Sequence, residues 1–231
     1  LQIPVFMDCR CLRFGKKYKN IITNYDFILK NYEINPTVIL RYGPRPISKQ
    51  LNQLIDNHKE VYKMDSYSEK GVNWGDYYRD PNEFLDYGNI KNNKSWFDKL
   101  INMQKAIENQ IQSFFKAPKC HEGYIINAII STMPKNSNLM IGNSSPIRDL
   151  DTFTFNLDKK INVYSNRGAS GIDGLISTAI GMSINKKTFN ALIIGDVSFY
   201  YDYWFIWYSS AREISLWILH LISSATVHVL N

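Results

Sequence analysis

Short apolar, β-branched runs alternate with a helical pattern in the first third of the chain. The run TVIL at Thr37–Leu40 predicts a strand, Ser48–His58 a helix and Glu60–Met64 a second strand. A strand, a helix and a strand in this order predict one βαβ unit with parallel strands. The polar stretch Asp65–Lys94 is rich in Asn, Asp, Tyr and Gly, and it predicts a long surface connection with a domain boundary.

The middle of the chain changes to longer helical patterns and buried strands. Apolar residues recur at three- and four-residue steps over Trp96–Phe115, which is typical of an amphipathic helix. A second helix is predicted over Glu122–Thr132, with Pro118 between the two. Three apolar strands follow at Leu139–Gly142, Ile161–Tyr164 and Ala191–Gly195. Each strand leads into a polar or glycine-rich loop and then a helical stretch, so the predicted fold class is α/β with doubly wound parallel sheets.

Residues 203–231 differ in composition from the rest of the chain. Three of the five tryptophans lie there, and only Arg212 and Glu213 are charged. The uncharged run after Glu213 has the length of a membrane anchor, but its polar interruption SSATVH favours a buried helix and strand of an incomplete domain. We therefore expect no membrane span.

Composition narrows the function classes only slightly. With 231 residues, 45% of them hydrophobic, the chain can bury a core, and its net charge of +6 favours anionic partners in general. Cys9, Cys11 and Cys120 form no CxxC pair and have no histidine cluster beside them. This argues against a disulfide scaffold and a structural zinc site, and it suits a reducing compartment. Basic and aromatic residues are not interleaved as in RNA-binding proteins, so we expect no nucleic-acid partner.

The loop GNSSPIR after the first of the three strands is a candidate anion site. Ser145 is a good N-cap and Pro146 a good first helical residue, so the N–H groups of the new helix would face a ligand above the strand. Arg148 in the first turn would add a two-pronged donor for a carboxylate or phosphate. The alternative is an ordinary turn in which Arg148 pairs with Asp149 or Asp151.

The loop SNRGASGIDG after the second strand carries three glycines at three-residue intervals. Glycines allow the backbone to approach a ligand closely, and Asp173 or Ser170 could cap the helix that follows. The loop is neither GxGxxG nor a phosphate loop ending in GK[ST], which removes the main support for dinucleotide or nucleoside triphosphate binding. The stiff Ile172 among the glycines either fills a local core or presses on a bound ring.

Asp196 follows the third strand directly. A carboxylate at the end of a buried strand is costly unless it is solvated or paired, and Mg²⁺ held between carboxylate and phosphate oxygens would pair it. The alternative is an aspartate that caps the next turn.

Taken together, these loops resemble one enzyme family. SNRGASGIDGLISTAIG followed by LIIGDVSFYYD resembles the thiamine-diphosphate enzymes of menaquinone and phylloquinone synthesis, the 2-succinyl-5-enolpyruvyl-6-hydroxy-3-cyclohexene-1-carboxylate synthases (the MenD family). GNSSPIR is similar to that family's GNS…R loop, and RYGPRPISKQL to its central-domain strand and turn. The resemblance implies part of a central domain over 1–95, the first half of a thiamine-diphosphate-binding domain over 96–202, and a divergent aromatic tail over 203–231.

The resemblance implies a transferase that decarboxylates 2-oxoglutarate and adds the succinyl unit to isochorismate, with thiamine diphosphate and Mg²⁺ (or Mn²⁺) as cofactors. Asp196 matches the family's metal-ligating aspartate, and Val197 and Ser198 match adjoining cofactor contacts. Ile172 matches the residue that wedges the cofactor into its bent conformation.

The same resemblance implies residues that bind isochorismate, the substrate that accepts the succinyl unit. Ser144, Arg148 and Arg167 match residues that hold isochorismate, and Lys49 is expected near them. Arginine binds carboxylates in a bidentate manner, so these side chains would account for the preference for anions.

Two departures from the family pattern shape the functional expectation. The pyrimidine-binding domain, with the glutamate that activates the cofactor, would precede Leu1, so we expect no catalytic residue in this chain. The family's YDxN is replaced by YDYW at 201–204, and position 223 is a serine. We therefore expect a truncated or frameshifted fragment that is inactive without the missing domains, with residues 203–231 unrelated to the fold.

The family further implies a homo-oligomer in the bacterial cytoplasm or the plastid stroma. The alternative function is a non-catalytic anion-binding or oligomerisation module that folds by itself.

Overall fold

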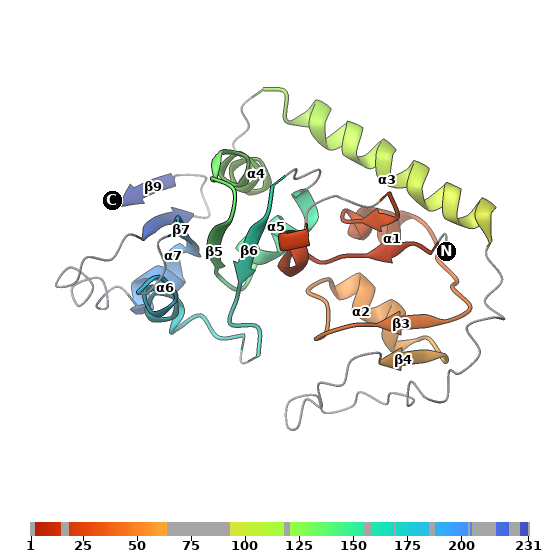
Figure 1. Ribbon diagram of the computed structural model, residues 1–231, viewed down its shortest axis with the longest axis horizontal. Helices are drawn as coiled ribbons and strands as arrows, with labels where there is room; N and C mark the ends of the chain where they lie inside the picture. Colours follow the sequence, from red (N-terminus) through yellow and green to blue (C-terminus); the bar gives the residue numbers. More distant parts are fainter. Residues whose placement is uncertain are drawn as a thin grey trace.

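The computed structural model describes residues 3–14, 19–63, 93–117, 121–154, 159–168, 170–184, 188–202, 204, 216–221 and 227–230. Within these residues two bodies lie side by side along the longest axis, and one long helix runs along the top of the view (Figure 1). Pro118, Cys120 and nearly all of the predicted connection over 65–94 lie outside the described residues.

The first body contains the predicted βαβ unit. Strand β3 (Ile39–Arg41), helix α2 (Lys49–Asp56) and strand β4 (Val61–Lys63) follow one another, and β3 pairs with β4 in parallel. Before them, β1 (Val5–Phe6) and β2 (Ile21–Ile22) form a second parallel pair, followed by α1 (Tyr25–Asn31). The βαβ prediction is confirmed, although each element is shorter than its sequence pattern.

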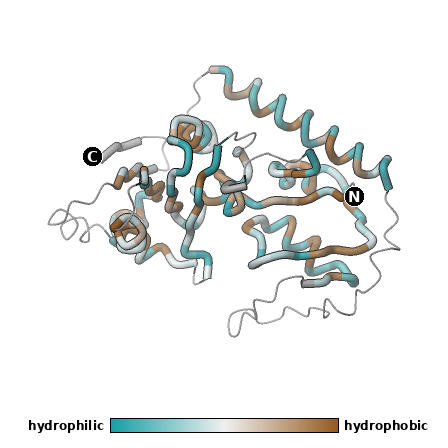
Figure 2. Tube along the Cα trace, in the orientation of Figure 1, coloured by the Kyte–Doolittle hydropathy of each residue, from teal (hydrophilic) through white to brown (hydrophobic). Residues whose placement is uncertain are grey.

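Helix α3 (Lys94–Phe114) packs against the first body. Hydrophobic and hydrophilic residues alternate along it (Figure 2), and its Leu100 belongs to the same buried cluster as Ile22, Ile28 and Leu51. The predicted boundary between residues 95 and 96 stays a prediction, but the packing of Leu100 crosses it.

The second body is a five-stranded sheet in the order β6-β5-β7-β8-β9. Its strands are β5 (Ser137–Ile141), β6 (Ile161–Tyr164), β7 (Asn190–Gly195), β8 (Trp217–Leu221) and β9 (Val227–Leu230). All pairs are parallel except β8 with β9. Four helices accompany the strands: α4 (Glu122–Thr132), α5 (Ser145–Phe153), α6 (Leu175–Ser183) and α7 (Asp196–Asp202).

Alternation along the strands explains why helices cover both faces of this sheet. Leu139 and Ile141 of β5 point into a cluster that includes Ile126 of α4 and Ile147 of α5. Met140, between them, points into the opposite cluster with the apolar residues of α6. Burying each such side chain contributes about 1.5–3 kcal/mol. The doubly wound α/β prediction is confirmed.

Part of the aromatic tail belongs to this sheet. Strand β8 pairs with β7 over five positions, and its Ile218 is 7% exposed and packs in the cluster of α6. The expectation that residues 203–231 are unrelated to the fold is therefore wrong for β8 and β9. The buried strand favoured by the pattern after Glu213 is observed as β8, but its pairing with β7 could not be read from the sequence. In the described part of the chain, no helix combines the length and apolar character that a membrane crossing requires.

Candidate functional site

Three candidate loops leave the same edge of the sheet. Strand β5 lies between β6 and β7, and all three run parallel. The chain passes from β5 to β6 on one side and then to β7 on the other, which makes the carboxyl end of β5 a topological switch point. Ligands of doubly wound sheets bind at such a point. The loops that begin at Asn143, Ser165 and Asp196 all start there.

The GNSSPIR loop differs from the prediction at its cap. Ser144, rather than Ser145, is the N-cap of α5, and its side chain makes no capping hydrogen bond because its backbone has φ +72°. This left-handed conformation is costly for a non-glycine residue and leaves Ser144 exposed. Its hydroxyl lies 3.4 Å from Nη2 of Arg148. Across the described residues Arg148 forms no ion pair with Asp149 or Asp151, so the alternative pairing is not observed.

The glycine-rich loop places Arg167 in a closed turn. The Ser170 amide donates to the carbonyl of Asn166 at 3.0 Å, and its hydroxyl donates to the carbonyl of Arg167 at 2.8 Å. Burial lowers the pKa of the Arg167 guanidinium, and the positive charges of Arg10 and Arg148 lower it further. Arg167 therefore feels the positive charges of Arg148 and of Arg10, which is itself paired with Asp8, and this environment favours a bound anion.

The predicted caps of α6 are also wrong. The helix begins after Gly174 at φ +72°, and neither Ser170 nor Asp173 caps it. Instead Oδ2 of Asp202, on α7, accepts a hydrogen bond from the Ile176 amide at 2.9 Å. The cap comes from a residue remote in the sequence, so a search of the preceding loop could not find it.

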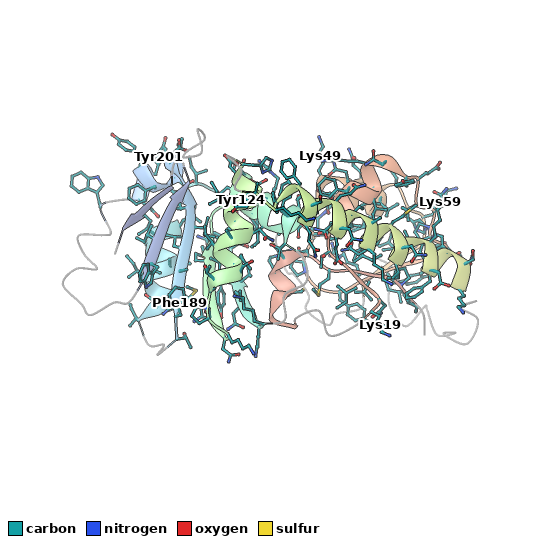
Figure 3. All side chains as sticks on the ribbon, turned by 90° about the horizontal axis from the view of Figure 1, so that it is seen from above. Lys19, Lys49, Lys59, Tyr124, Phe189 and Tyr201 are labelled. Atoms are coloured by element: carbon teal, nitrogen blue, oxygen red, sulfur yellow. The ribbon has the colours of Figure 1, made fainter. Side chains whose placement is uncertain are left out.

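A cavity of about 350 Å³ lies between α1, α2 and α5. It brings together Lys49 of α2 and Arg148 of α5, two of the residues predicted to bind isochorismate. The other two, Ser144 and Arg167, do not line it. In Figure 3, Lys49 lies at one edge of the molecule and Lys19 at the opposite edge. The complete lining is Asp26, Lys30, Ile47, Ser48, Lys49, Gln50, Arg148, Asp151 and Thr152.

The two acids of the cavity are held by neutral donors. Asp26 accepts a hydrogen bond from the Ser48 hydroxyl. Asp151 accepts from the Cys9 amide at 2.7 Å and from the Tyr25 hydroxyl at 2.6 Å. Burial raises the pKa of Asp151 to about 7, so a fraction of this carboxyl is neutral at physiological pH.

The cations of the cavity are less engaged. Neither Lys30 nor Lys49 has a hydrogen-bond or ion-pair partner within the described ranges. Together with Arg148 they give the cavity three positive groups, which fits an anionic ligand. Sequence reasoning missed Lys30, because a lysine in the last turn of a helix is common and carries no ligand signal of its own.

The residues expected to bind the cofactor follow β7 and β6. Asp196 is the first residue of α7, and its Oδ1 accepts from the Val197 amide at 2.9 Å. Ser198 is buried and Val197 is 55% exposed. A Cβ added at Gly195 would meet no atom within 4 Å, so the strand end opens onto free space. One carboxylate beside open space fits a site in which Asp196 would hold a divalent metal such as Mg²⁺.

Ile172 is 36% exposed and therefore does not fill a local core. That observation removes the simpler of the two explanations for a stiff residue among glycines. Contact with a bound ring stays a prediction.

A separate group of possible metal ligands lies at the junction of the two bodies. Among the residues that the structure describes, Asp8, Cys9 and Asp151 have ligand atoms within 4.8 Å of one another. Asp8 is bound to Arg10 at 2.6 Å and both oxygens of Asp151 accept hydrogen bonds. Burial raises the pKa of the Cys9 thiol, which keeps it protonated. These engaged groups are typical of a structural junction rather than a metal centre.

Comparison with known proteins gives a consistent set of relatives. No protein-family model matches the chain. It is 32% identical over 220 residues to the 2-succinyl-5-enolpyruvyl-6-hydroxy-3-cyclohexene-1-carboxylate synthase of Bacillus velezensis, and 32% identical over 224 residues to that of Bacillus pumilus. The corresponding synthase of Listeria innocua is 32% identical over 209 residues. The first two matches cover 87% of this chain but only 38% of each relative.

Proposed function

Because this chain belongs to the 2-succinyl-5-enolpyruvyl-6-hydroxy-3-cyclohexene-1-carboxylate synthase family, we propose that it supplies the isochorismate-binding and diphosphate-binding parts of such an enzyme. The reaction is the decarboxylation of 2-oxoglutarate and the addition of the succinyl unit to isochorismate. Thiamine diphosphate, when bound, provides the electron sink for the decarboxylation. The residues of this chain bind and orient the partners of that reaction.

The observation that carries the proposal is the shared position of Lys49 and Arg148. They come from different bodies of the fold, yet both line one cavity whose cations face a common space. Isochorismate carries two carboxylates, and Arg148 suits one of them because a guanidinium binds a carboxylate through two hydrogen bonds. Lys49 supplies a point charge for the other, and Arg167 adds positive potential from the neighbouring loop.

On the cofactor side, Asp196 would hold Mg²⁺, and Val197 and Ser198 would contact thiamine diphosphate. Ile172 would contact the cofactor ring from the glycine-rich loop. The exposure of Ile172 and the open space at Gly195 support the assignments of Ile172 and Asp196.

Self-association is part of the proposal. Val197, Tyr200, Tyr201 and Trp204 leave large apolar surfaces exposed on and just after α7. Exposed apolar surfaces of this kind are typical of protein interfaces. Sedimentation of the wild-type chain and of Tyr200→Ser measures the tendency to associate. A wild-type chain that stays monomeric at all concentrations would contradict the proposed self-association.

Titration calorimetry with isochorismate tests the acceptor site. Arg148→Gln and Lys49→Gln should each weaken binding about tenfold, because each removes a charged donor to a carboxylate. Lys59→Gln is the matched control, since Lys59 does not line the cavity. Equal affinities in all three variants would contradict the proposed site.

A second titration separates the synthase from a plain anion-binding module. Thiamine diphosphate with Mg²⁺ should bind the wild-type chain, and Asp196→Asn should weaken that binding. Asp173→Asn is the control and should leave the affinity unchanged. If isochorismate binds but thiamine diphosphate does not, in the presence or absence of Mg²⁺, the chain is a non-catalytic anion-binding module.

A further inference from the structure

Asn143 lies buried beneath the site, at the carboxyl end of β5. Its side chain is 3% exposed, and it stands between Gly142 and the exposed, left-handed Ser144. A Cβ added at Gly142 would lie 3.3 Å from the carbonyl oxygen of Ile193, so this strand end fits closely against β7. The backbone around Asn143 therefore turns Ser144 outward and keeps the Asn143 amide inside.

The side-chain amide of Asn143 spans the glycine-rich loop. Its Nδ2 donates to the carbonyl of Asn166 at 3.1 Å and to the carbonyl of Gly171 at 2.7 Å. These two carbonyls stand immediately before Arg167 and immediately before Ile172. One NH₂ group thus fixes both ends of the segment between the two proposed ligand contacts.

The far side of the same segment is tied to α6. Nδ2 of Asn166 donates to the Thr178 hydroxyl at 3.1 Å. The loop therefore has one side-chain connection to α6 and one, through Asn143, to the central strand. Because the like charges of Arg10 and Arg148 act on Arg167, the loop needs such a connection to keep Arg167 close to them.

The remaining polar atom of the Asn143 side chain, Oδ1, is unsatisfied in the part of the chain that the structure describes. Oδ1 of Asn143 is buried, and within the described residues it has no hydrogen-bond partner. The same holds for Oγ of Ser165, at the carboxyl end of the neighbouring strand β6. Most buried polar atoms in folded proteins have a hydrogen-bond partner, so two unsatisfied oxygens at neighbouring strand ends mark this edge of the sheet as a candidate functional position.

We propose that Asn143 is a positioning residue that holds Arg167 and Ile172 in place by binding the carbonyls of Asn166 and Gly171. The ligands of Arg167 and Ile172 are those of the proposed function, on which this inference rests. Asn143 itself acts through the loop and not on a reacting atom.

The first test needs no ligand. Asn143→Asp keeps the size of the side chain but replaces its donors by an acceptor that faces two carbonyls. Amide hydrogen exchange of Ser170, whose N–H binds the carbonyl of Asn166, should become about tenfold faster. Asn162→Asp is the matched control, because Asn162 donates to Asn138 in the same sheet. Unchanged exchange at Ser170 in Asn143→Asp would overturn the proposal.

The second test asks whether Asn143 acts through Arg167. Isochorismate affinity is measured for Asn143→Asp, Arg167→Gln and the double variant, and in a parallel cycle with Arg148→Gln. Asn143→Asp should weaken binding about fivefold, with little further loss when Arg167 is already replaced, and additively with Arg148→Gln. Additive losses in both cycles would reduce Asn143 to a purely structural residue and overturn the proposal.

The proposed function and the role of Asn143 can be contradicted independently of each other. If the wild-type chain binds no isochorismate, the proposed function fails, while Ser170 exchange still decides whether Asn143 holds the loop. If Asn143→Asp does not fold, Asn143→Ser takes its place, since one hydroxyl can satisfy only one of the two carbonyls. Exchange at Ser170 should then be intermediate, and wild-type exchange would count against the proposal.

Discussion

The hydroxyl of Tyr25 donates a hydrogen bond of 2.6 Å to Oδ2 of Asp151 and so joins α1 of the first body to α5 of the sheet body. The Cys9 amide donates to the other oxygen of the same carboxyl at 2.7 Å. Next to this pair, the side-chain amide of Asn24 donates to the carbonyl of Thr152 at 2.7 Å. The two bodies therefore meet through buried polar groups, and the proposed acceptor cavity opens beside this junction because Asp151 also lines it.

Asp151 should make the stability of the chain depend on pH. Burial, together with the nearby charges of Asp8 and Asp26, raises its pKa from 3.8 to about 7. The folded state therefore binds a proton that the unfolded state releases above pH 4, so this contribution is fully present below pH 4 and is lost as pH rises through 7. Three pKa units correspond to roughly 4 kcal/mol.

Denaturation of Asp151→Asn in urea between pH 4 and pH 8 checks this dependence. The variant should lose much of the fall in unfolding free energy, because an amide keeps the acceptor for Cys9 without titrating. Asp149, whose pKa is also raised to about 7 by burial and by the neighbouring Glu122 carboxyl, should account for part of the remaining slope. Asp98→Asn on the exposed side of α3 is the control. A wild-type slope in Asp151→Asn would show that this carboxyl does not titrate in the expected range.

Lys30 should contribute to anion binding in the cavity. Lys30→Gln removes one of the three cations that line it, so affinity for isochorismate should fall about two- to fivefold. The loss should shrink in high salt, because ions screen an exposed lysine. Lys19→Gln is the control, because Lys19 does not line the cavity and lies at the edge of the molecule opposite Lys49 (Figure 3). An equal loss in both variants would point to net charge rather than to the cavity.

Asp202, and not Asp173, should stabilise α6. Asp202→Ala removes the acceptor for the Ile176 amide and should lower the free energy of unfolding by about 1–2 kcal/mol, the usual effect of losing a helix cap. Asp173→Ala removes the cap expected from the sequence and should change stability by less than about 0.5 kcal/mol. Urea denaturation compares the free energies of unfolding of the two variants directly. If Asp173→Ala were the more destabilising variant, the cap predicted from the sequence would be the correct one.

The elements that the sequence predicted well are those whose pattern is set by their own burial. Helix α4 has the predicted bounds, and β6 does as well: α4 buries Ile126 and Ile130 on one face, and β6 buries Ile161 and Val163 in alternation. The predicted cap of α6 was wrong because the observed cap, Asp202, is distant in the sequence. The shared cavity of Lys49 and Arg148 could not follow from spacing, since it depends on how the two bodies dock, and the sequence led to it only through a family resemblance.

The tail is where sequence pattern and tertiary structure differ most, and Ile218 tests that difference. Ile218→Ala removes a side chain that is buried against β7 and α6, so the free energy of unfolding should fall by about 2–4 kcal/mol. Ile184→Ala is the control, because that isoleucine is 47% exposed and its loss leaves no cavity. If residues 203–231 were independent of the fold, both variants would unfold at the wild-type urea concentration. A loss confined to Ile218→Ala would show that β8 completes the sheet whose other strands carry Asn143 and Asp196.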